Sequence, residues 1–310
     1  MPDNTKKSHD RWLQMVIVRL CGGLGNQMFQ YAAARRLALA NDAPLKLDLS
    51  WFTSIRQGDT NRHYELSVFN SVQDVASPAQ VKALRGAEIG RWPKVMKCLL
   101  ETTGFLVKQT CVREKQYHFN PDFLGLRGDA YLDGYWQSAK YFADSAEILR
   151  ADFTIKFAPD SLNRDIGDFI QSCEAVSIHV RRGDYVANKS VSRHHGSSTL
   201  QYYKTAIDEM TTRLSHPHFF VFSDDPTWVK NNLKVEAPTT YIDNNGPEKG
   251  YEDLRLMSLC RHHIIANSSF SWWGAWLSMH PEKIVIAPQK WFNRDDIDTS
   301  DLLPKSWLRR

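Results

Sequence analysis

The sequence predicts an α/β protein with parallel sheets, because strands and helices alternate in two separate stretches. From residue 175 to residue 287, short apolar strands alternate with helical segments, a pattern typical of a doubly wound sheet. Residues 15–49 contain a strand, a glycine-rich turn, a helix and a second strand, which together form a βαβ unit. A chain of 310 residues more often forms two domains than one, so two domains are expected.

The N-terminal half shows fewer regular elements than the C-terminal half. Its expected strands cover residues 15–20, 45–49 and 131–137, and its expected helices cover residues 27–40, 78–84 and 139–151. Residues 63–69 fit either a short strand or a loop, and residues 92–112 follow no clear pattern. Asn26 and Ser77 are expected to cap the helices that follow them.

The glycine-rich turn over residues 21–25 leads into the first expected helix. Together with Asp48 it partly matches a dinucleotide-binding fingerprint, but Met28 stands at the position of the third glycine. Such a turn can hold an anion or polar ligand at the helix start, although close packing of helix on strand would also require glycine. Packing alone does not explain the two amides that follow, which are expected to face the same crevice. We therefore expect a ligand-binding role for Gly23, Gly25, Asn26 and Gln27.

The C-terminal half alternates more clearly. Its expected strands cover residues 175–180, 219–222, 239–243, 263–266 and 283–287. Its expected helices cover residues 199–214, 251–261 and 270–279, with a short helix that begins at Pro226. The carboxyl ends of parallel strands meet at one edge of the sheet, where α/β proteins bind their ligands. The residues that follow these strands are therefore the candidates for a site.

Three of these strands end in polar residues suited to a nucleotide. The residues are Arg181, Arg182, Gly183 and Asp184 after the first strand, Ser223, Asp224 and Asp225 after the second, and Asn267, Ser268 and Ser269 after the third. Guanidinium groups match phosphate oxygens, free N–H groups at a helix start add donors, and an aspartate can accept from a ribose hydroxyl or a guanine edge. Each group also has a structural explanation, since aspartate and serine often cap helices. The agreement of three strand ends favours a site.

Aromatic residues leave two interpretations open. The chain contains ten tryptophans, and aromatic rings stack on sugars as well as filling cores. Trp272 and Trp273 are expected in the core. Tyr135, Trp136 and Gln137 either line a sugar site or belong to the core.

Composition narrows the class of protein. The apolar fraction of 42% and the charged fraction of 24% are those of an ordinary globular protein. A net charge of +4 gives no argument for nucleic acid binding. The five cysteines are odd in number and none is spaced CxxC, which predicts reduced thiols in a cytoplasmic protein without a zinc site. Residues 1–14 are expected to be a flexible leader.

Four motifs span nearly the whole chain. They are GGLGNQMFQYA from Gly22, HVRRGDY from His179, SDD from Ser223 with the nearby Trp228, and NSSFSWWGAWL from Asn267. Together they resemble the bacterial α1,2-fucosyltransferases of glycosyltransferase family 11. The resemblance implies a GT-B fold, in which two Rossmann-like domains face each other across a cleft. We expect an acceptor-side domain over residues 1–157 and a donor domain over residues 158–310.

The resemblance also implies an activity. It is the inverting transfer of L-fucose from GDP-β-L-fucose to O2 of a terminal β-galactoside, which forms a Fuc-α1,2-Gal linkage in O-antigen or another surface glycan. GDP-fucose is then a substrate, and no metal or other cofactor is expected. The expected partners are GDP-fucose and a galactose-terminated glycan, and a lipid-linked acceptor would bring the enzyme to the inner membrane.

The family pattern HxRRxD matches His179, Arg181, Arg182 and Asp184 position by position. Negative charge builds on GDP as the glycosidic bond breaks, and Arg181 is the candidate that stabilises it. Asp184 and His179 are candidates for a general base, and Arg182 is expected to support the loop or to pair with Asp184. The expected donor-binding residues are Arg181, Arg182, Ser223, Asp224, Asp225, Asn267, Ser268, Ser269 and Phe270; fucose or the acceptor would contact Gly23, Gly25, Asn26 and Gln27.

Two alternatives remain. A nicotinamide-dependent oxidoreductase would use Gly23, Gly25 and Asp48, but the chain lacks the third glycine and this interpretation leaves the two arginines unexplained. A non-catalytic protein that binds glycans or sugar nucleotides is the other.

Overall fold

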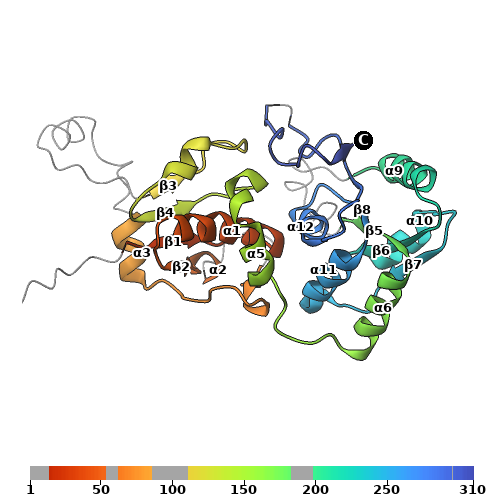
Figure 1. The fold of residues 1–310 in the computed structure, drawn as a ribbon, viewed down its shortest axis with the longest axis horizontal. Coiled ribbons are helices and arrows are strands. Elements are labelled where there is room, and N and C mark those ends of the chain that lie inside the picture. The colour runs from red at the N-terminus through yellow and green to blue at the C-terminus, as the bar shows by residue number, and fades with distance from the viewer. Residues whose placement is uncertain (1–13, 54–61, 86–110, 183–197, 295) are drawn as a thin grey trace, which may run out of the picture.

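The chain forms two α/β units, each built on a parallel sheet (Figure 1). A computed structural model describes residues 14–53, 62–85, 111–182, 198–294 and 296–310. The expected α/β class is confirmed. The chain passes from the first sheet to the second between residues 153 and 160, and the division at residues 157 and 158 stays a prediction.

The N-terminal unit contains a four-stranded sheet in the order β2-β1-β4-β3. Its strands are β1 (Val16–Arg19), β2 (Leu45–Asp48), β3 (Cys111–Arg113) and β4 (Ala130–Asp133). Its α-helices are α1 (Leu24–Ala40), α2 (Ser50–Thr53), α3 (Pro78–Arg85) and α5 (Ala146–Asp152). Short 3-10 helices cover Leu66–Val68, Pro121–Gly125, Ala139–Tyr141 and Ala143–Ser145. The sheet is parallel throughout, and β1 lies between β2 and β4.

Several expectations for this unit were wrong in detail. Helix α1 begins at Leu24 with Gly23 at the N-cap position, so Asn26 lies inside the helix and does not cap it. The segment 63–69 contains a 3-10 turn, and the helix expected over 139–151 is two 3-10 turns followed by α5. Strand β4 ends at Asp133, four residues earlier than expected, because the chain turns sharply at Gly134.

The C-terminal unit contains a six-stranded parallel sheet in the order β10-β9-β8-β5-β6-β7. Its strands are β5 (Glu174–Val180), β6 (Pro217–Ser223), β7 (Thr239–Ile242), β8 (His262–Ile264), β9 (Val285–Ala287) and β10 (Leu308–Arg309). Its α-helices are α6 (Ser161–Ser172), α9 (Leu200–Arg213), α10 (Pro226–Asn232), α11 (Gly250–Leu259) and α12 (Ser269–Leu277), and a 3-10 turn covers Pro247–Lys249. Strand β10 and helix α6 were not predicted. The strand order is that of a Rossmann fold, whose switch point lies between β5 and β8.

Strand β5 is buried on both faces, which is typical of a central parallel strand. Val176, Ile178 and Val180 pack with residues of α9 in one apolar cluster. Ala175 belongs to a second cluster, which also contains residues of α11 and α12. The strand therefore holds its carboxyl end, and the two arginines that follow it, in a fixed place.

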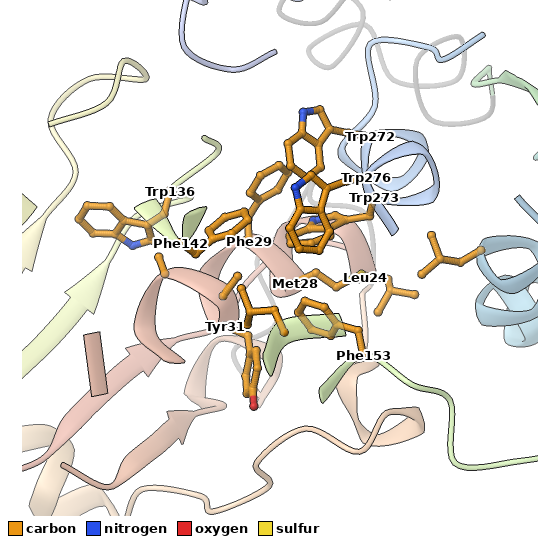
Figure 2. Close-up of a cluster of buried hydrophobic side chains, with 14 of the residues drawn as sticks. Leu24, Met28, Phe29, Tyr31, Trp136, Phe142, Phe153, Trp272, Trp273 and Trp276 are labelled. Carbon is orange, nitrogen blue, oxygen red and sulfur yellow. The ribbon is translucent and has the colours of Figure 1, made fainter. Parts of the chain in front are cut away.

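Helix α12 joins the two units, and Figure 1 shows it between them. An aromatic junction, defined as Phe29, Phe142, Phe153, Trp272, Trp273 and Trp276, lies between α1 and α12 (Figure 2). The rings of Phe142 and Trp273 stack with centroids 5.5 Å apart, and the rings of Phe29 and Trp272 lie 4.5 Å apart. Trp272 and Trp273 are fully buried, which confirms that they are core residues. One core thus serves both sheets and fixes the two units relative to each other.

Candidate active site

The three polar strand ends of the C-terminal unit meet at one edge of its sheet, as predicted. Strand β5 pairs with β6 on one side and with β8 on the other, and all three run parallel. The residues after β5 and β8 therefore flank the switch point, where doubly wound sheets bind ligands. Two groups with donors for phosphate follow these two strands: the arginines after β5 and the start of α12 after β8.

Arg181 is held by a carboxylate from the neighbouring strand end. Its Nη1 lies 3.1 Å from Oδ2 of Asp224, and Oδ1 of Asp224 accepts a 2.8 Å hydrogen bond from the backbone N–H of Arg182. Both side chains of this ion pair are about three-quarters buried, with 23% exposure each. Asp224 was expected to contact the nucleotide directly. The structure gives it a different contact, since it orients the arginine.

Whereas Arg181 contacts Asp224, Arg182 contacts Trp228 and Asp225. Its guanidinium lies 3.6 Å above the ring of Trp228, and its Nε lies 3.6 Å from a carboxylate oxygen of Asp225. Asp225 in turn accepts a 3.1 Å hydrogen bond from the N–H of Trp228 and so caps α10, which confirms the capping role expected for one of the two aspartates. Ser223 supports the same turn by accepting from the N–H of Asp225. Asp184, the other expected partner of Arg182, lies outside the described residues.

At the start of α12, the groups suited to bind phosphate are backbone N–H groups, because the side chain of Asn267 is already hydrogen-bonded within the protein. Asn267 is buried and donates to the carbonyl of Trp291, while its Oδ1 accepts from Ser198. Ser268 occupies the N-cap position of α12 without a side-chain hydrogen bond to the helix. The N–H groups of the first turn therefore lack a side-chain cap and carry the positive end of the helix dipole.

Helix α1 meets α12 at Gly25. A Cβ on Gly25 would lie 2.5 Å from the backbone N of Phe270 and 2.5 Å from the carbonyl carbon of Ser269. The indole N–H of Trp273 donates to the carbonyl of Gly25 at 3.0 Å. Gly25 is thus required for the contact between the two helices, which argues for packing and against a ligand contact at this glycine.

Asn26 lies at this contact and bonds to both units. Its Oδ1 accepts a 2.8 Å hydrogen bond from Nε2 of Gln137 and another of 2.8 Å from Oγ of Ser269. The side chain is half-buried. Because its oxygen is occupied, only its NH₂ group is left without a hydrogen-bond partner among the described residues, and the role of Asn26 in binding a ligand stays a prediction.

Gln27 does not face the site. Its side chain is fully buried, donates to the carbonyls of Gly22 and His63, and accepts from the N–H of Glu65. The expectation of a second amide in the crevice is therefore wrong, because successive helix positions point about 100° apart and this one points into the core. Gly23 fills the N-cap position and lies close to the guanidinium of Arg62.

His179 is a poor candidate for a general base. Its ring is buried, packs against Phe270 with centroids 5.5 Å apart, and has no hydrogen-bond partner for Nδ1 among the described residues. Burial, assisted by the charge of Arg181, lowers the pKa of His179 to about 3. The imidazole is neutral at physiological pH and binds a proton too weakly to act as an efficient base.

The dinucleotide-binding interpretation does not fit the geometry. Both carboxylate oxygens of Asp48 are occupied, by the hydroxyl of Tyr131 and by the N–H of Ser50, and the residue is 2% exposed. Asp48 therefore has no free carboxylate oxygen for a ribose, and Gly25 is required for close packing against α12 and not for a turn around a pyrophosphate of the dinucleotide-binding type.

Two residues near the site were missed or left undecided by the sequence. Arg62 lies beside Gly23 but comes from a segment without a recognisable pattern. Gln137 holds Asn26 from a corner whose shape the sequence does not reveal. Within the described ranges, no cluster of three or more His, Cys, Asp or Glu could hold a metal ion, and no helix is long and apolar enough to cross a membrane.

Comparisons with known proteins agree with this arrangement. The model of the family described as Glycosyl transferase family 11 matches residues 117–309. An alpha-1,2-colitosyltransferase of Escherichia coli is 34% identical, covering 96% of this chain and 99% of its own. The O-antigen biosynthesis glycosyltransferase WbnK of Escherichia coli is 33% identical, covering 93% of this chain and 98% of its own.

Among solved structures, an Arabidopsis thaliana FUT1 variant in complex with GDP superimposes with a TM-score of 0.51 at 12% identity. The match covers 90% of this chain and 71% of that one. At this identity the likeness concerns the fold alone, and it confirms the GT-B architecture.

Proposed function

Because the chain belongs to glycosyltransferase family 11, we propose that it transfers L-fucose from GDP-β-L-fucose to O2 of a terminal β-galactoside with inversion, forming a Fuc-α1,2-Gal linkage. The observation that carries the proposal is that Arg181 and the start of α12 follow the two neighbouring strands, β5 and β8, that flank the switch point of the C-terminal sheet. The GDP diphosphate would bind between them. This transfer would take place during O-antigen or other surface glycan synthesis.

The leaving group needs a positive charge that is already in place. As the bond from fucose to phosphate breaks, charge develops on the β-phosphate, and a cation that Asp224 already orients needs little rearrangement to stabilise it. The N–H groups at the start of α12 would add donors to the same diphosphate. These groups could stabilise the leaving GDP without a metal ion. We therefore propose that the transfer needs no metal.

The acceptor would approach from the N-terminal unit. Asn26 presents its NH₂ group at the junction of α1 and α12, and it would hold the fucose or the attacking galactose. The general base stays unassigned among the described residues, since His179 is neutral and buried. Asp184 remains the candidate.

The donor sugar has a second candidate. The Escherichia coli relative with 34% identity is named as a transferase of colitose with the same α1,2 linkage. Colitose is L-fucose without its 3-hydroxyl, so the same diphosphate site would serve either donor. Discrimination between them depends on whether a protein group hydrogen-bonds that hydroxyl.

The test is transfer from GDP-fucose and, separately, from GDP-colitose to lactose in the presence of EDTA, with the product linkage read by NMR. We expect an α1,2-linked product from the wild type. Replacing Arg181 with alanine should lower kcat by about 10²–10³-fold, since it removes one preorganised donor to the developing charge.

Arg181→Lys serves as the matched variant, because it keeps the charge but loses the fork that Asp224 orients. An Arg181→Ala protein with undiminished kcat would contradict the assignment. Product from GDP-colitose alone would replace fucose as the donor sugar and leave the diphosphate site standing.

A further inference from the structure

The corner that follows β4, residues 134–137, is held by the half-buried carboxylate of Glu114. Oε2 of Glu114 accepts a 2.6 Å hydrogen bond from the N–H of Tyr135, and Oε1 accepts a 3.0 Å hydrogen bond from the N–H of Trp136. A Cβ at Gly134 would collide with Glu114, so only glycine allows this approach. Trp136 adopts a left-handed backbone conformation with φ of 56°, which is uncommon for a bulky residue. The chain is thus held in a strained turn at a defined place.

The two aromatic rings of the corner, Tyr135 and Trp136, lie in different environments. Trp136 is 2% exposed and packs against Phe123 and Tyr141 in the core. Tyr135 is 37% exposed. Of the exposed aromatic residues in the described part of the chain, Phe157 lies between α5 and α6 and Phe169 lies on α6, whereas Tyr135 directly follows the carboxyl end of a strand.

Tyr135 lies beside the junction of the two units. Strands β1 and β4 are neighbours, so the residues after them share one edge of the N-terminal sheet. Val18 pairs with Leu132 and Arg19 bonds to Asp133 at the ends of these strands, so Tyr135 leaves the sheet beside the glycine-rich turn. Two residues further on, Gln137 donates to Asn26, which also bonds Ser269 of α12. The corner is therefore joined, through Gln137 and Asn26, to the start of α12, where the donor is proposed to bind.

The same edge carries charged groups. Nη1 of Arg19 lies 2.8 Å from Oδ1 of Asp133. The two side chains are 19% and 21% exposed to solvent. Nε of Arg113 lies 3.6 Å from the other oxygen of Asp133. These groups are placed where a sugar would find both donors and acceptors for its hydroxyls.

We propose that Tyr135 and the Arg19–Asp133 ion pair form the acceptor subsite and bind the terminal β-galactoside. The ring would stack on the face of galactose formed by its C3–H, C4–H and C5–H bonds, and the ion pair would hydrogen-bond its hydroxyls. Glu114 is a positioning residue, since it acts only by holding the corner. The inference rests on the proposed function for the identity of the sugar.

The test compares Tyr135→Ala, Tyr135→Phe and Glu114→Gln with the wild type. Tyr135→Ala should raise the KM for lactose about three- to tenfold, in line with the loss of one aromatic contact. The KM for GDP-fucose and the slow hydrolysis of GDP-fucose without acceptor should not change. Tyr135→Phe keeps the ring and loses only the hydroxyl, so its KM for lactose should rise less than that of Tyr135→Ala.

Glu114→Gln should raise the lactose KM in the same way, and the double variant should be no worse than Tyr135→Ala, because both changes act through one ring. Phe157→Ala removes an exposed aromatic of the segment between α5 and α6 and serves as the control for general effects. Thermal melts establish that each variant is folded.

A second measurement separates this inference from the proposed function. Saturation-transfer NMR with lactose and GDP should show contacts with the wild type and lose them in Tyr135→Ala, whatever the donor sugar is. If the wild type transfers fucose but Tyr135→Ala keeps its lactose KM and its NMR contacts, the subsite is wrong and the function stands. If the wild type gives no lactose contacts, the subsite is also wrong. If neither GDP-fucose nor GDP-colitose is used while the lactose contacts depend on Tyr135, the donor assignment fails and the subsite stands.

Discussion

At the scale of single residues, the Arg181–Asp224 pair leads to the sharpest prediction. Asp224→Asn removes the negative charge that orients Arg181 at 3.1 Å but keeps nearly the same shape. We expect kcat to fall about tenfold, less than the roughly 10²-fold that a 1 Å displacement of a catalytic group can cost. The KM for lactose should not change. The measurement is steady-state kinetics with both substrates varied.

Asp225→Asn is the matched control, since asparagine caps helices about as well as aspartate. It should cost less activity than Asp224→Asn. The reverse order of the two effects would show that Asp225, rather than Asp224, supports the diphosphate site.

The sequence could predict which residues gather at the site better than what each residue does there. Arg181, Asp224 and Ser268 follow strands whose order in the sheet brings them together, and this part was predicted from alternation alone. Gln27 was predicted at the site as one of two amides that packing did not explain, but neighbouring helix positions face different ways and Gln27 is buried. The Asn26–Ser269 hydrogen bond joins residues 243 positions apart, and no local pattern reports such a contact.

At the scale of elements, the contact between the first turns of α1 and α12 can be tested at Gly25. In Gly25→Ala the new Cβ would lie 2.5 Å from backbone atoms of α12, which cannot move aside as a flexible side chain could. Overpacking of this kind typically costs about 1–3 kcal/mol, and the shift of α12 should also lower kcat. Thermal unfolding and kinetics measure the two effects.

Gly125→Ala provides the control, because a Cβ at that position would meet no atom within 4 Å. It should leave both stability and kcat close to those of the wild type. A Gly25→Ala protein with normal activity would mean that α12 can shift without disturbing the donor site.

Elements with a strong apolar pattern were predicted well, and short or polar ones were not. Strands β5 and β6 are seven residues long and almost wholly buried, and the runs of apolar residues within them were long enough to indicate strands. Strands β3 and β10 have three and two residues and include a charged residue each, so they carry too little apolar pattern to separate them from loops, whereas β8 and β9 are equally short but lie within longer apolar runs. The corner after β4 depends on Glu114, some 20 residues away, and so has no local signal.

At the scale of the whole molecule, the two sheets share one core. The resemblance implied two domains that face each other, but the sequence did not indicate which residues join them, because the tryptophans of α12 are equally suited to a core within one unit. The structure places them against Phe29 of α1 and Phe142, both from the N-terminal unit. This junction gives the proposed active site a fixed geometry, since Asn26 and Ser269 approach each other from opposite units.

The shared core predicts cooperative unfolding of the two units. Far-UV circular dichroism and tryptophan fluorescence should report one coincident transition for the wild type. Trp273 stacks on Phe142 and donates to Gly25, so Trp273→Ala should lower the free energy of unfolding by about 3–5 kcal/mol and separate the two transitions. Trp228→Ala also removes a tryptophan, but one that packs within the C-terminal unit, and should keep the transitions coincident. Two separate transitions in the wild type would show that the units fold independently and that the junction does not fix the site.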